Sequence, residues 1–126
     1  MKLSATVTAP LYSTEDEEKV AKALLNIFPK ATLVQTSDGK IVARISGLEG
    51  FEKLRMIIRT RRIRKTVRAL LNKGLRDNTV TFYLNKQAAS VGKVSFFEEG
   101  EVMALGPITV VVETDEPARF IEWLTE

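Results

Sequence analysis

The sequence predicts one α+β domain over residues 1–126, built as two layers with a mixed or antiparallel sheet and its helices packed on one face. Segments whose apolar residues alternate every second position are interspersed with segments in which they recur every three to four positions. Short turns join neighbouring strand-like segments, which favours hairpins and an α+β class. A chain of 126 residues with 44% hydrophobic and 28% charged residues is typical of one globular core.

The N-terminal part of the chain predicts a strand followed by a helix. Residues 2–9 alternate polar and apolar side chains, as a half-buried strand does. Residues 15–28 place their apolar side chains on one helical face, with Thr14 and Glu17 in the spacing of a capping box. Pro29 is expected to stop this helix.

The middle and the end of the chain add further strands and a last helix. Residues 31–37 and 40–46 flank Asp38-Gly39, which is a favoured two-residue hairpin turn. Asp115 is expected to cap a final helix that begins at Pro117. Further strand signals lie at 79–84, 93–97 and 107–113, with a shorter one at 102–105.

Residues 51–74 have helical composition but two apolar stripes on opposite sides. Phe51, Leu54, Ile57 and Ile58 share one face, and Ile63, Val67, Leu70 and Leu71 share a face about 180° away. One straight helix would leave one stripe in water, so we expect two helices that meet near Thr60. Thr60 is the expected N-cap of the second helix, and Gly74 is its expected C-terminal stop.

The same segment concentrates the positive charge. Between Lys53 and Arg76 there are ten basic and no acidic residues, while the rest of the chain has nine basic and sixteen acidic residues, a net charge of −7. A solvated helix face would explain long basic side chains, but such faces usually interleave Glu for i,i+4 pairing. The unpaired charge therefore favours a polyanionic partner.

We interpret that partner as RNA. The exposed arc is nearly all Arg and Lys, which suits phosphates and shape-led RNA recognition better than base reading in the DNA major groove. A membrane-surface helix would expose Trp, Phe or Leu beside the charges, and here the apolar residues are needed for the core. The predicted phosphate contacts are Arg59, Arg61, Arg62, Arg64, Lys65 and Arg68.

A second candidate site lies in residues 82–93, which read FYLNKQAASVGK. A strand leads into Asn85, a good N-cap, and Gly92 is the expected stop of a short helix. Lys86 and Gln87 would lie at its first turn, where free backbone N–H groups favour a phosphate, and Lys93 follows. The alternative is a capped connection between two strands, with Ala88 and Ala89 placed for close packing.

The strings LNKQAASVGKVSF at 84–96 and ALGPITVVVE at 104–113 resemble an uncharacterised archaeal family of small proteins, described as predicted RNA-binding proteins or predicted exosome subunits. The resemblance covers nearly the whole chain. It implies a fold similar to that of the ribosomal protein that binds 5S ribosomal RNA. The motif positions carried by this chain are Asn85, Lys86, Gln87, Ala88 and Ala89.

The composition excludes several kinds of chemistry. With no Cys and no His, the chain has no disulfide, thiolate nucleophile, Cys/His zinc site or His-based triad. Glu98, Glu99 and Glu101 could bind Mg²⁺, but an exposed turn explains them as well. Tyr12, Tyr83 and Trp123 are candidate stacking residues, yet each lies in or beside an apolar pattern and is expected in the core.

We therefore expect a non-catalytic RNA-binding domain without cofactor or metal, linked to RNA processing or degradation. The expected partners are ribosomal or otherwise structured RNA, a multiprotein RNA-processing complex and a second copy of the chain in a homodimer. The alternative is a protein-interaction or self-assembly module whose basic helix docks on an acidic partner. No apolar run is long enough for a membrane span, and a cytoplasmic location is expected. The lack of Cys, with few Asn and Gln, is typical of a thermophile protein.

Overall fold

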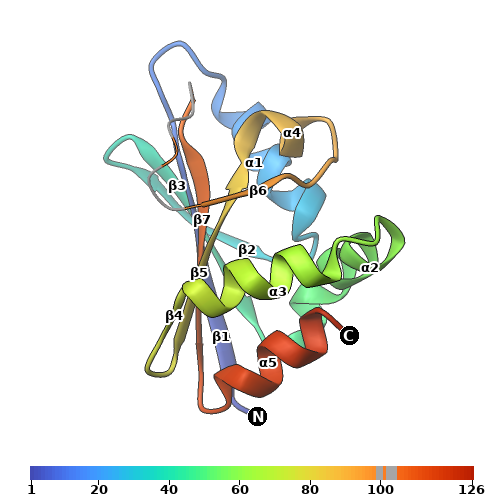
Figure 1. The fold of residues 1–126 in the computed structure, drawn as a ribbon. Coiled ribbons are helices and arrows are strands. Elements are labelled where there is room, and N and C mark those ends of the chain that lie inside the picture. The colour runs from blue at the N-terminus through green and yellow to red at the C-terminus, as the bar shows by residue number, and fades with distance from the viewer. Residues whose placement is uncertain (99–100, 102–104) are drawn as a thin grey trace.

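A computed structural model describes residues 1–98, 101 and 105–126, so most of the expected strand at 102–105 and the side chain of Glu99 lie outside it. The described chain forms an α+β structure with a seven-stranded antiparallel sheet (Figure 1). In order, its elements are β1 (Leu3–Pro10), α1 (Glu17–Ile27), β2 (Thr32–Ser37), β3 (Lys40–Ser46), η1 (Leu48–Phe51), α2 (Glu52–Thr60), α3 (Arg64–Lys73), β4 (Leu75–Arg76), β5 (Thr79–Asn85), α4 (Lys86–Ser90), β6 (Phe96–Phe97), β7 (Pro107–Thr114) and α5 (Pro117–Leu124).

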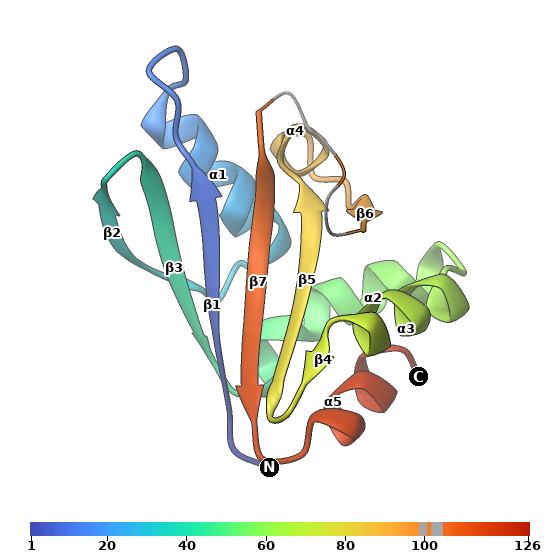
Figure 2. The same cartoon turned by 60° about the vertical axis from the view of Figure 1, so that its left-hand side comes forward.

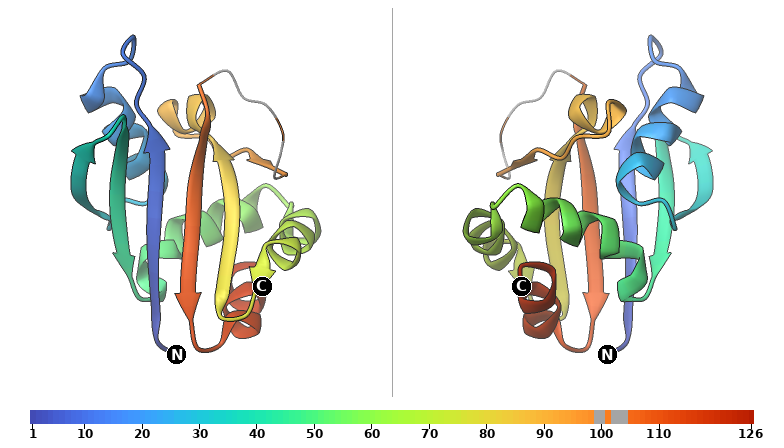
Figure 3. Two further views of the ribbon diagram at one scale, coloured as in Figure 1. Left: turned by 90° about the vertical axis from the view of Figure 1, so that its left-hand side faces the viewer. Right: turned by 90° about the vertical axis from the view of Figure 1, so that its right-hand side faces the viewer.

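The strand order is β2-β3-β1-β7-β5-β4, and β6 pairs with the other end of β5 (Figure 2). The first strand and the last strand of the chain are therefore neighbours in the middle of the sheet. The α-helices α1 to α5 of the described residues all lie on one side of the sheet, as the two opposite views of Figure 3 show. The predicted α+β class, with helices on one face, is confirmed, and the sheet is antiparallel rather than mixed.

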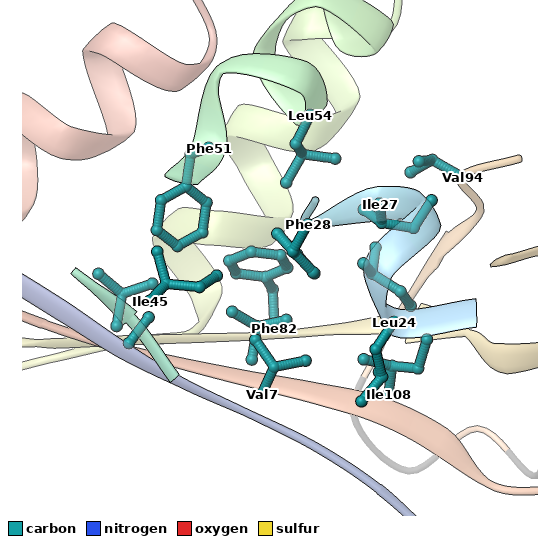
Figure 4. Packing of buried hydrophobic residues seen from close by; sticks show 14 of the residues in the cluster. Val7, Leu24, Ile27, Phe28, Ile45, Phe51, Leu54, Phe82, Val94 and Ile108 are labelled. Atoms are coloured by element: carbon teal, nitrogen blue, oxygen red, sulfur yellow. The ribbon is translucent and has the colours of Figure 1, made fainter. Parts of the chain in front are cut away.

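The core fills the space between the sheet and the helices. Alternate residues of β1, β3, β5 and β7 are buried there, and the helices add their apolar faces (Figure 4). Three aromatic rings connect the helical layer. Phe51 packs edge-on against Phe28 at 5.7 Å and against Phe120 at 5.1 Å between ring centroids, a geometry that aromatic pairs prefer.

The predicted β2–β3 hairpin is confirmed. Asp38 and Gly39 have φ angles of 53° and 71°, which are the left-handed conformations that a tight hairpin turn needs. The predicted capping box of α1 is wrong, because Asp16 is the N-cap and its side chain accepts a hydrogen bond from the Glu18 N–H. An Asp placed directly before the first turn satisfies that free donor without the longer Thr14–Glu17 arrangement.

The predicted break in the basic segment is also confirmed. α2 buries Leu54 and Ile58, and α3 buries Val67 and Leu71, so both apolar stripes reach the same core. The predicted role of Thr60 is wrong, because Thr60 is the last residue of α2 and the second helix begins at Arg64 without a side-chain cap.

Two other boundaries differ from the sequence prediction. Asp115 does not cap α5: its carboxylate accepts a hydrogen bond from the Lys2 N–H, and Thr114 Oγ1 accepts from the Glu116 N–H instead. The expected strand at 93–97 is reduced to β6, because Val94 turns into the core. The short strand β4 was not predicted, since two residues give no periodicity.

Gly74 ends α3 as expected, but with a φ of −87° rather than the left-handed angle of a typical C-terminal glycine. Its absent side chain matters for another reason. A Cβ atom at this position would lie 1.9 Å from the carbonyl oxygen of Thr81, on β5. The end of α3 therefore packs directly against the backbone of the sheet.

We predict that Gly74→Ala destabilises the protein by about 1–3 kcal/mol or more, because α3 must move away from β5. Urea denaturation followed by circular dichroism measures this loss. Thr66→Ala, on the exposed side of the same helix, is the control and should change the stability by less than about 0.5 kcal/mol. An unchanged midpoint for Gly74→Ala would contradict the close packing.

Candidate nucleic-acid interface

The turn between α2 and α3 gathers five basic side chains at one end of the helical layer. This tip cluster, as we call it, consists of Arg59, Arg61, Arg62, Arg64 and Lys65, and all five are exposed. Arg62 has a φ of 58°, and this left-handed residue reverses the chain between the helices. Ile63 is half-buried and packs against the core, which fixes the turn at its base.

The sequence prediction placed Arg61 and Arg62 on the second helix, and the structure corrects this. Both residues belong to the connection between α2 and α3, while Arg59 lies in the last turn of α2. Residues 61–63 lie outside both helices. The basic side chains of the tip cluster therefore come from the turn and from the two helix ends beside it, rather than from one face of a single helix. The predicted residues are brought together, but by a different element.

Most of the tip cluster has no electrostatic partner among the residues that the structure describes. Arg59, Arg62, Arg64 and Lys65 make no side-chain hydrogen bond or ion pair with any described residue. Arg61 differs, because its Nη1 donates a hydrogen bond to the carbonyl oxygen of Val94. Arg61 thus ties the turn to the segment after α4.

That tie brings a distant predicted residue to the tip cluster. A groove of about 440 Å³ lies between α2 and the residues after α4, and both Arg61 and Lys93 line it. Lys93 is exposed. The sequence predicts Lys93 as part of a second contact near the start of the short helix, and the structure places it at the groove that Arg61 also lines.

Arg68 has a structural role in addition to any contact with a ligand. Its Nε donates to Thr125 Oγ1 at 3.0 Å, and its Nη2 donates to the Thr125 carbonyl oxygen at 2.9 Å. Arg55 makes a similar contact, with Nε donating to the Trp123 carbonyl oxygen at 2.9 Å and the guanidinium lying over the Trp123 ring. These arginines donate hydrogen bonds to carbonyl oxygens at the C-terminal end of α5. A positive charge at this end also interacts favourably with the helix dipole.

The LNKQAA motif builds a capped and buried corner. Asn85 accepts a hydrogen bond from the Ala88 N–H at 3.1 Å, as predicted for an N-cap, and Gly92 follows the end of α4. Ala89 is buried, and its carbonyl oxygen accepts a hydrogen bond from Asn26 on α1 at 3.0 Å. Ala88 is half-buried beside it, so both alanines allow α4 to pack closely.

Lys86 is engaged within the protein. Only 3% of its side chain is exposed, and its Nζ donates to the Pro10 carbonyl oxygen at 2.6 Å and to Glu15 Oε1 at 2.8 Å. The ammonium also lies 5.1 Å from the centre of the Tyr12 ring. A sequence pattern cannot show this, because Glu15 and Lys86 are 71 residues apart.

The Glu15 carboxyl group completes that pair. Burial raises its pKa, but the hydrogen bonds from Lys86 and from the Tyr12 N–H, together with the Lys86 charge, outweigh burial and hold the pKa below its usual value. Gln87 is exposed and lines a separate cavity of about 300 Å³ beside the start of α1. Gln87 therefore does not share a surface groove with the tip cluster.

The expectation that all three candidate stacking residues lie in the core is wrong for two of them. Tyr12 is 46% exposed, and Tyr83 is half-buried because it points to the face of β5 opposite Phe82. Trp123 is partly buried under Arg55.

The acidic turn after β6 is only partly described. Glu98 pairs with Lys73 at 3.3 Å, and its backbone N–H donates to Glu101 Oε1 at 2.9 Å. Within residues 1–98, 101 and 105–126, no three acidic, His or Cys side chains are grouped to bind a metal ion. None of the described helices is long and apolar enough to cross a membrane.

Comparisons with known proteins identify related sequences and structures. A family model described as RNA binding matches residues 4–114. A UPF0201 protein of Methanothermobacter thermautotrophicus is 43% identical over 119 residues, which cover 94% of this chain and 87% of that protein. A UPF0201 protein of Pyrobaculum neutrophilum is 43% identical over 128 residues, covering 98% and 88%. The crystal structure of the UPF0201 protein from Methanococcus jannaschii superposes with a TM-score of 0.83 at 35% identity, covering 97% of this chain and 92% of that one.

We predict that Arg68→Ala costs about 1–3 kcal/mol of stability, because two hydrogen bonds from a charged donor to Thr125 are lost. Arg64→Ala, one turn earlier on the same helix, removes an exposed side chain and should cost less than about 0.5 kcal/mol. Thermal or urea denaturation of the two variants checks the difference. Equal stabilities would contradict the structural role of Arg68.

We also predict that Glu15 makes stability depend on pH in the acid range. Its folded-state pKa is lowered, so its contribution is present above the unfolded value of about 4.3 and is lost as the pH falls through the folded-state pKa. Glu15→Gln should therefore be less stable at neutral pH, by roughly 3 kcal/mol, and should lose less stability than the wild type on acidification.

Urea denaturation at pH 7, 4 and 3 measures this profile, with the exposed Glu18→Gln as the matched control on the same side of the molecule. Parallel pH profiles for the wild type and Glu15→Gln would show that the Glu15–Lys86 pair has no such role.

Proposed function

The chain belongs to the UPF0201 family, whose model is described as RNA binding, and from this premise we propose that it binds the phosphate backbone of RNA through the tip cluster. The proposal assigns no reaction to the protein. It names the contacts by their chemistry, namely guanidinium and ammonium groups against phosphate oxygens.

The observation that carries the proposal is that four of the five tip-cluster side chains have no partner among the described residues. Arg59, Arg62, Arg64 and Lys65 are exposed and, within the described residues, unpaired. Like charges at this density repel one another, which costs free energy in the unbound protein. Phosphates relieve that repulsion, so the arrangement favours a polyanion over solvent alone.

The proposed contact surface extends in two directions from the turn. Lys93 adds a cation across the groove that it shares with Arg61. In the first half of α3, Arg64, Lys65 and Arg68 are exposed and lie within about 100° of one another around the helix axis. Together with the turn, this basic face suits several phosphates and recognition by backbone shape.

Three of the predicted contacts take a different place in the proposal. Lys86 is buried and paired, so we do not count it as an RNA contact. Gln87 is free to bind a ligand but lines a different cavity. Arg68 keeps an exposed stem, but its guanidinium is held by Thr125, so we expect its variants to affect stability as well as binding.

The wider role stays a prediction. We propose ribosomal or otherwise structured RNA as the target and a multiprotein RNA-processing complex, such as an exosome, as the setting. The proposed likeness to the 5S-rRNA-binding ribosomal protein belongs to the same expectation. All three rest on the sequence resemblance together with the basic tip cluster.

A protein partner with an acidic surface is the second candidate. Met56 is 67% exposed and lines the groove with Arg61 and Lys93, so an apolar contact lies beside the charges. Protein interfaces use such mixtures, with Met and Arg enriched. Binding of RNA that is unaffected by the tip cluster would favour this candidate, as would a dimer that dissociates at high salt.

We predict that reversing three tip charges, in Arg59→Glu, Arg64→Glu and Lys65→Glu combined, weakens RNA binding by on the order of a hundredfold at 0.1 M salt. These residues have no partner among the described residues, so the fold should persist. Fluorescence anisotropy between about 50 and 200 mM salt measures the affinity. The salt dependence should become shallower by about two units of log–log slope, as three phosphate contacts are lost.

The matched control reverses Lys22, Lys30 and Lys40, which are exposed elsewhere and give the same change in net charge. It should bind far better than the tip variant. Equal losses in both triple variants would mean that only the overall charge matters, and no loss in the tip variant would refute the proposed interface.

A further inference from the structure

No helix of the described chain covers the side of the sheet that faces away from the helical layer (Figure 3). Two rows of side chains cross it from strand to strand. One row contains Arg44, Thr6, Val111 and Thr81, and the other contains Val42, Thr8, Thr109, Tyr83 and Phe97. All nine residues are half-buried or exposed, and neither row contains a carboxylate.

Two aromatic rings stand side by side at one end of this face. Tyr83 on β5 and Phe97 on β6 are directly paired, with ring centroids 5.8 Å apart and ring planes inclined by 34°. Their neighbours Phe82 and Phe96 form an equivalent pair on the helical side, where they belong to or pack against the core. The outer pair is half-buried at the edge of the open face.

A groove of about 530 Å³ opens beside these rings. The groove lies where β4 pairs with Thr79 and Val80 and β6 pairs with Tyr83 and Leu84. Two residues of β5, Thr81 and Phe82, lie between these pairings, so Val80 and Tyr83 are about 10 Å apart along the strand. At Thr81 the backbone N–H donates to the Gly74 carbonyl oxygen, so the end of α3 forms one wall of the groove.

The groove has basic side chains at its rim. Lys73 and Arg76 line it together with Tyr83 and Phe97. Lys73 forms an exposed ion pair with Glu98, of a kind that contributes little to stability and exchanges readily. The Arg76 Nη1 donates to the carbonyl oxygens of Lys73 and Leu75, which orients the guanidinium and leaves its other N–H groups available.

We propose that this groove holds an unpaired base of a single-stranded RNA segment, stacked on Tyr83 and Phe97, while Lys73 and Arg76 bind the flanking phosphates. The inference rests on the proposed function, since it adds a second contact to the same RNA. Aromatic rings beside cations are the combination that single-strand binders use, because every base offers a face for stacking. Lys73 is at the opposite end of α3 from Arg64, about 14 Å along the helix axis, so one RNA strand can reach from the tip cluster to the groove.

The charge and the shape of the groove together indicate which ligand it binds. Among the described residues that line the groove, the one carboxylate is that of Glu98, and it is paired with Lys73. Glu113 lies in the next row of the open face and is exposed. The rows themselves carry hydroxyl groups and, at Arg44, a further cation. A duplex would present only its backbone to this face, whereas an unpaired base can enter the groove between β4 and β6.

The test uses Tyr83→Leu with Phe97→Leu, which removes both rings and keeps apolar side chains. Anisotropy is measured with a single-stranded RNA and with a blunt RNA duplex. We expect the variant to lose roughly ten- to a hundredfold in affinity for the single strand and to keep its salt dependence, because stacking involves no counterion release. Duplex binding should be unchanged. Val42→Thr, on the same face but at its far side, is the control and should bind as the wild type does.

Two further measurements keep the proposal falsifiable if the double variant folds poorly. A single-stranded RNA with one 2-aminopurine should lose fluorescence when the wild type binds, and Lys73→Gln with Arg76→Gln should reduce the salt slope and the single-strand affinity. Unchanged single-strand affinity in the aromatic variant, or an unchanged 2-aminopurine signal on binding, would overturn the groove while leaving the tip cluster in place. Failure of the wild type to bind any RNA would instead remove the proposed function.

Discussion

The two opposed apolar stripes on residues 51–74 are the constraint on which this structure depends. Because neither stripe can remain in water, the segment must break, and the break at residues 61–63 lets α2 and α3 both pack on the sheet. The basic side chains between and beside the stripes are then forced outward at the turn. Burial of Ile58 and Val67 and exposure of the tip cluster are two results of one folding requirement.

Six of the ten basic residues between Lys53 and Arg76 fall into two groups with different physical roles. Arg55 and Arg68 are held by carbonyls at the end of α5 and therefore stabilise the helical layer. Arg59, Arg62, Arg64 and Lys65 have no partner in the described part of the chain. Repulsion between closely spaced like charges raises the free energy of the unbound protein. An anionic ligand therefore gains the most binding free energy by contacting the second group. The number of charges in the sequence alone cannot show which basic side chains are bound inside the protein and which are exposed without a partner among the described residues.

The periodicity of apolar residues predicted most helices and strands of the fold. It failed where one contact between residues distant in the sequence determines whether a side chain is buried. The break of the basic helix, the Asp38-Gly39 hairpin and the Asn85 cap follow from local patterns, and the structure has all three. The burial of Lys86 depends on Glu15, far away in the sequence, so local signals at 82–93 favoured a phosphate site there. Likewise β4 is too short for a periodic signal, so the groove between β4 and β6 was not predicted. The alternation of β5 did contain the signal for Tyr83, which shares a face with Thr79 and Thr81 rather than with Phe82.

The measurement that tests the central claim most directly is a titration of the isotopically labelled protein with RNA, followed by amide NMR. A chain of 14.1 kDa is well suited to it. The account predicts that the largest shifts occur at residues 59–65 and around Lys93, with a second group at Tyr83 and Phe97 when the RNA contains an unpaired stretch. Shifts concentrated on β2 and β3, with the α2–α3 turn unaffected, would contradict it.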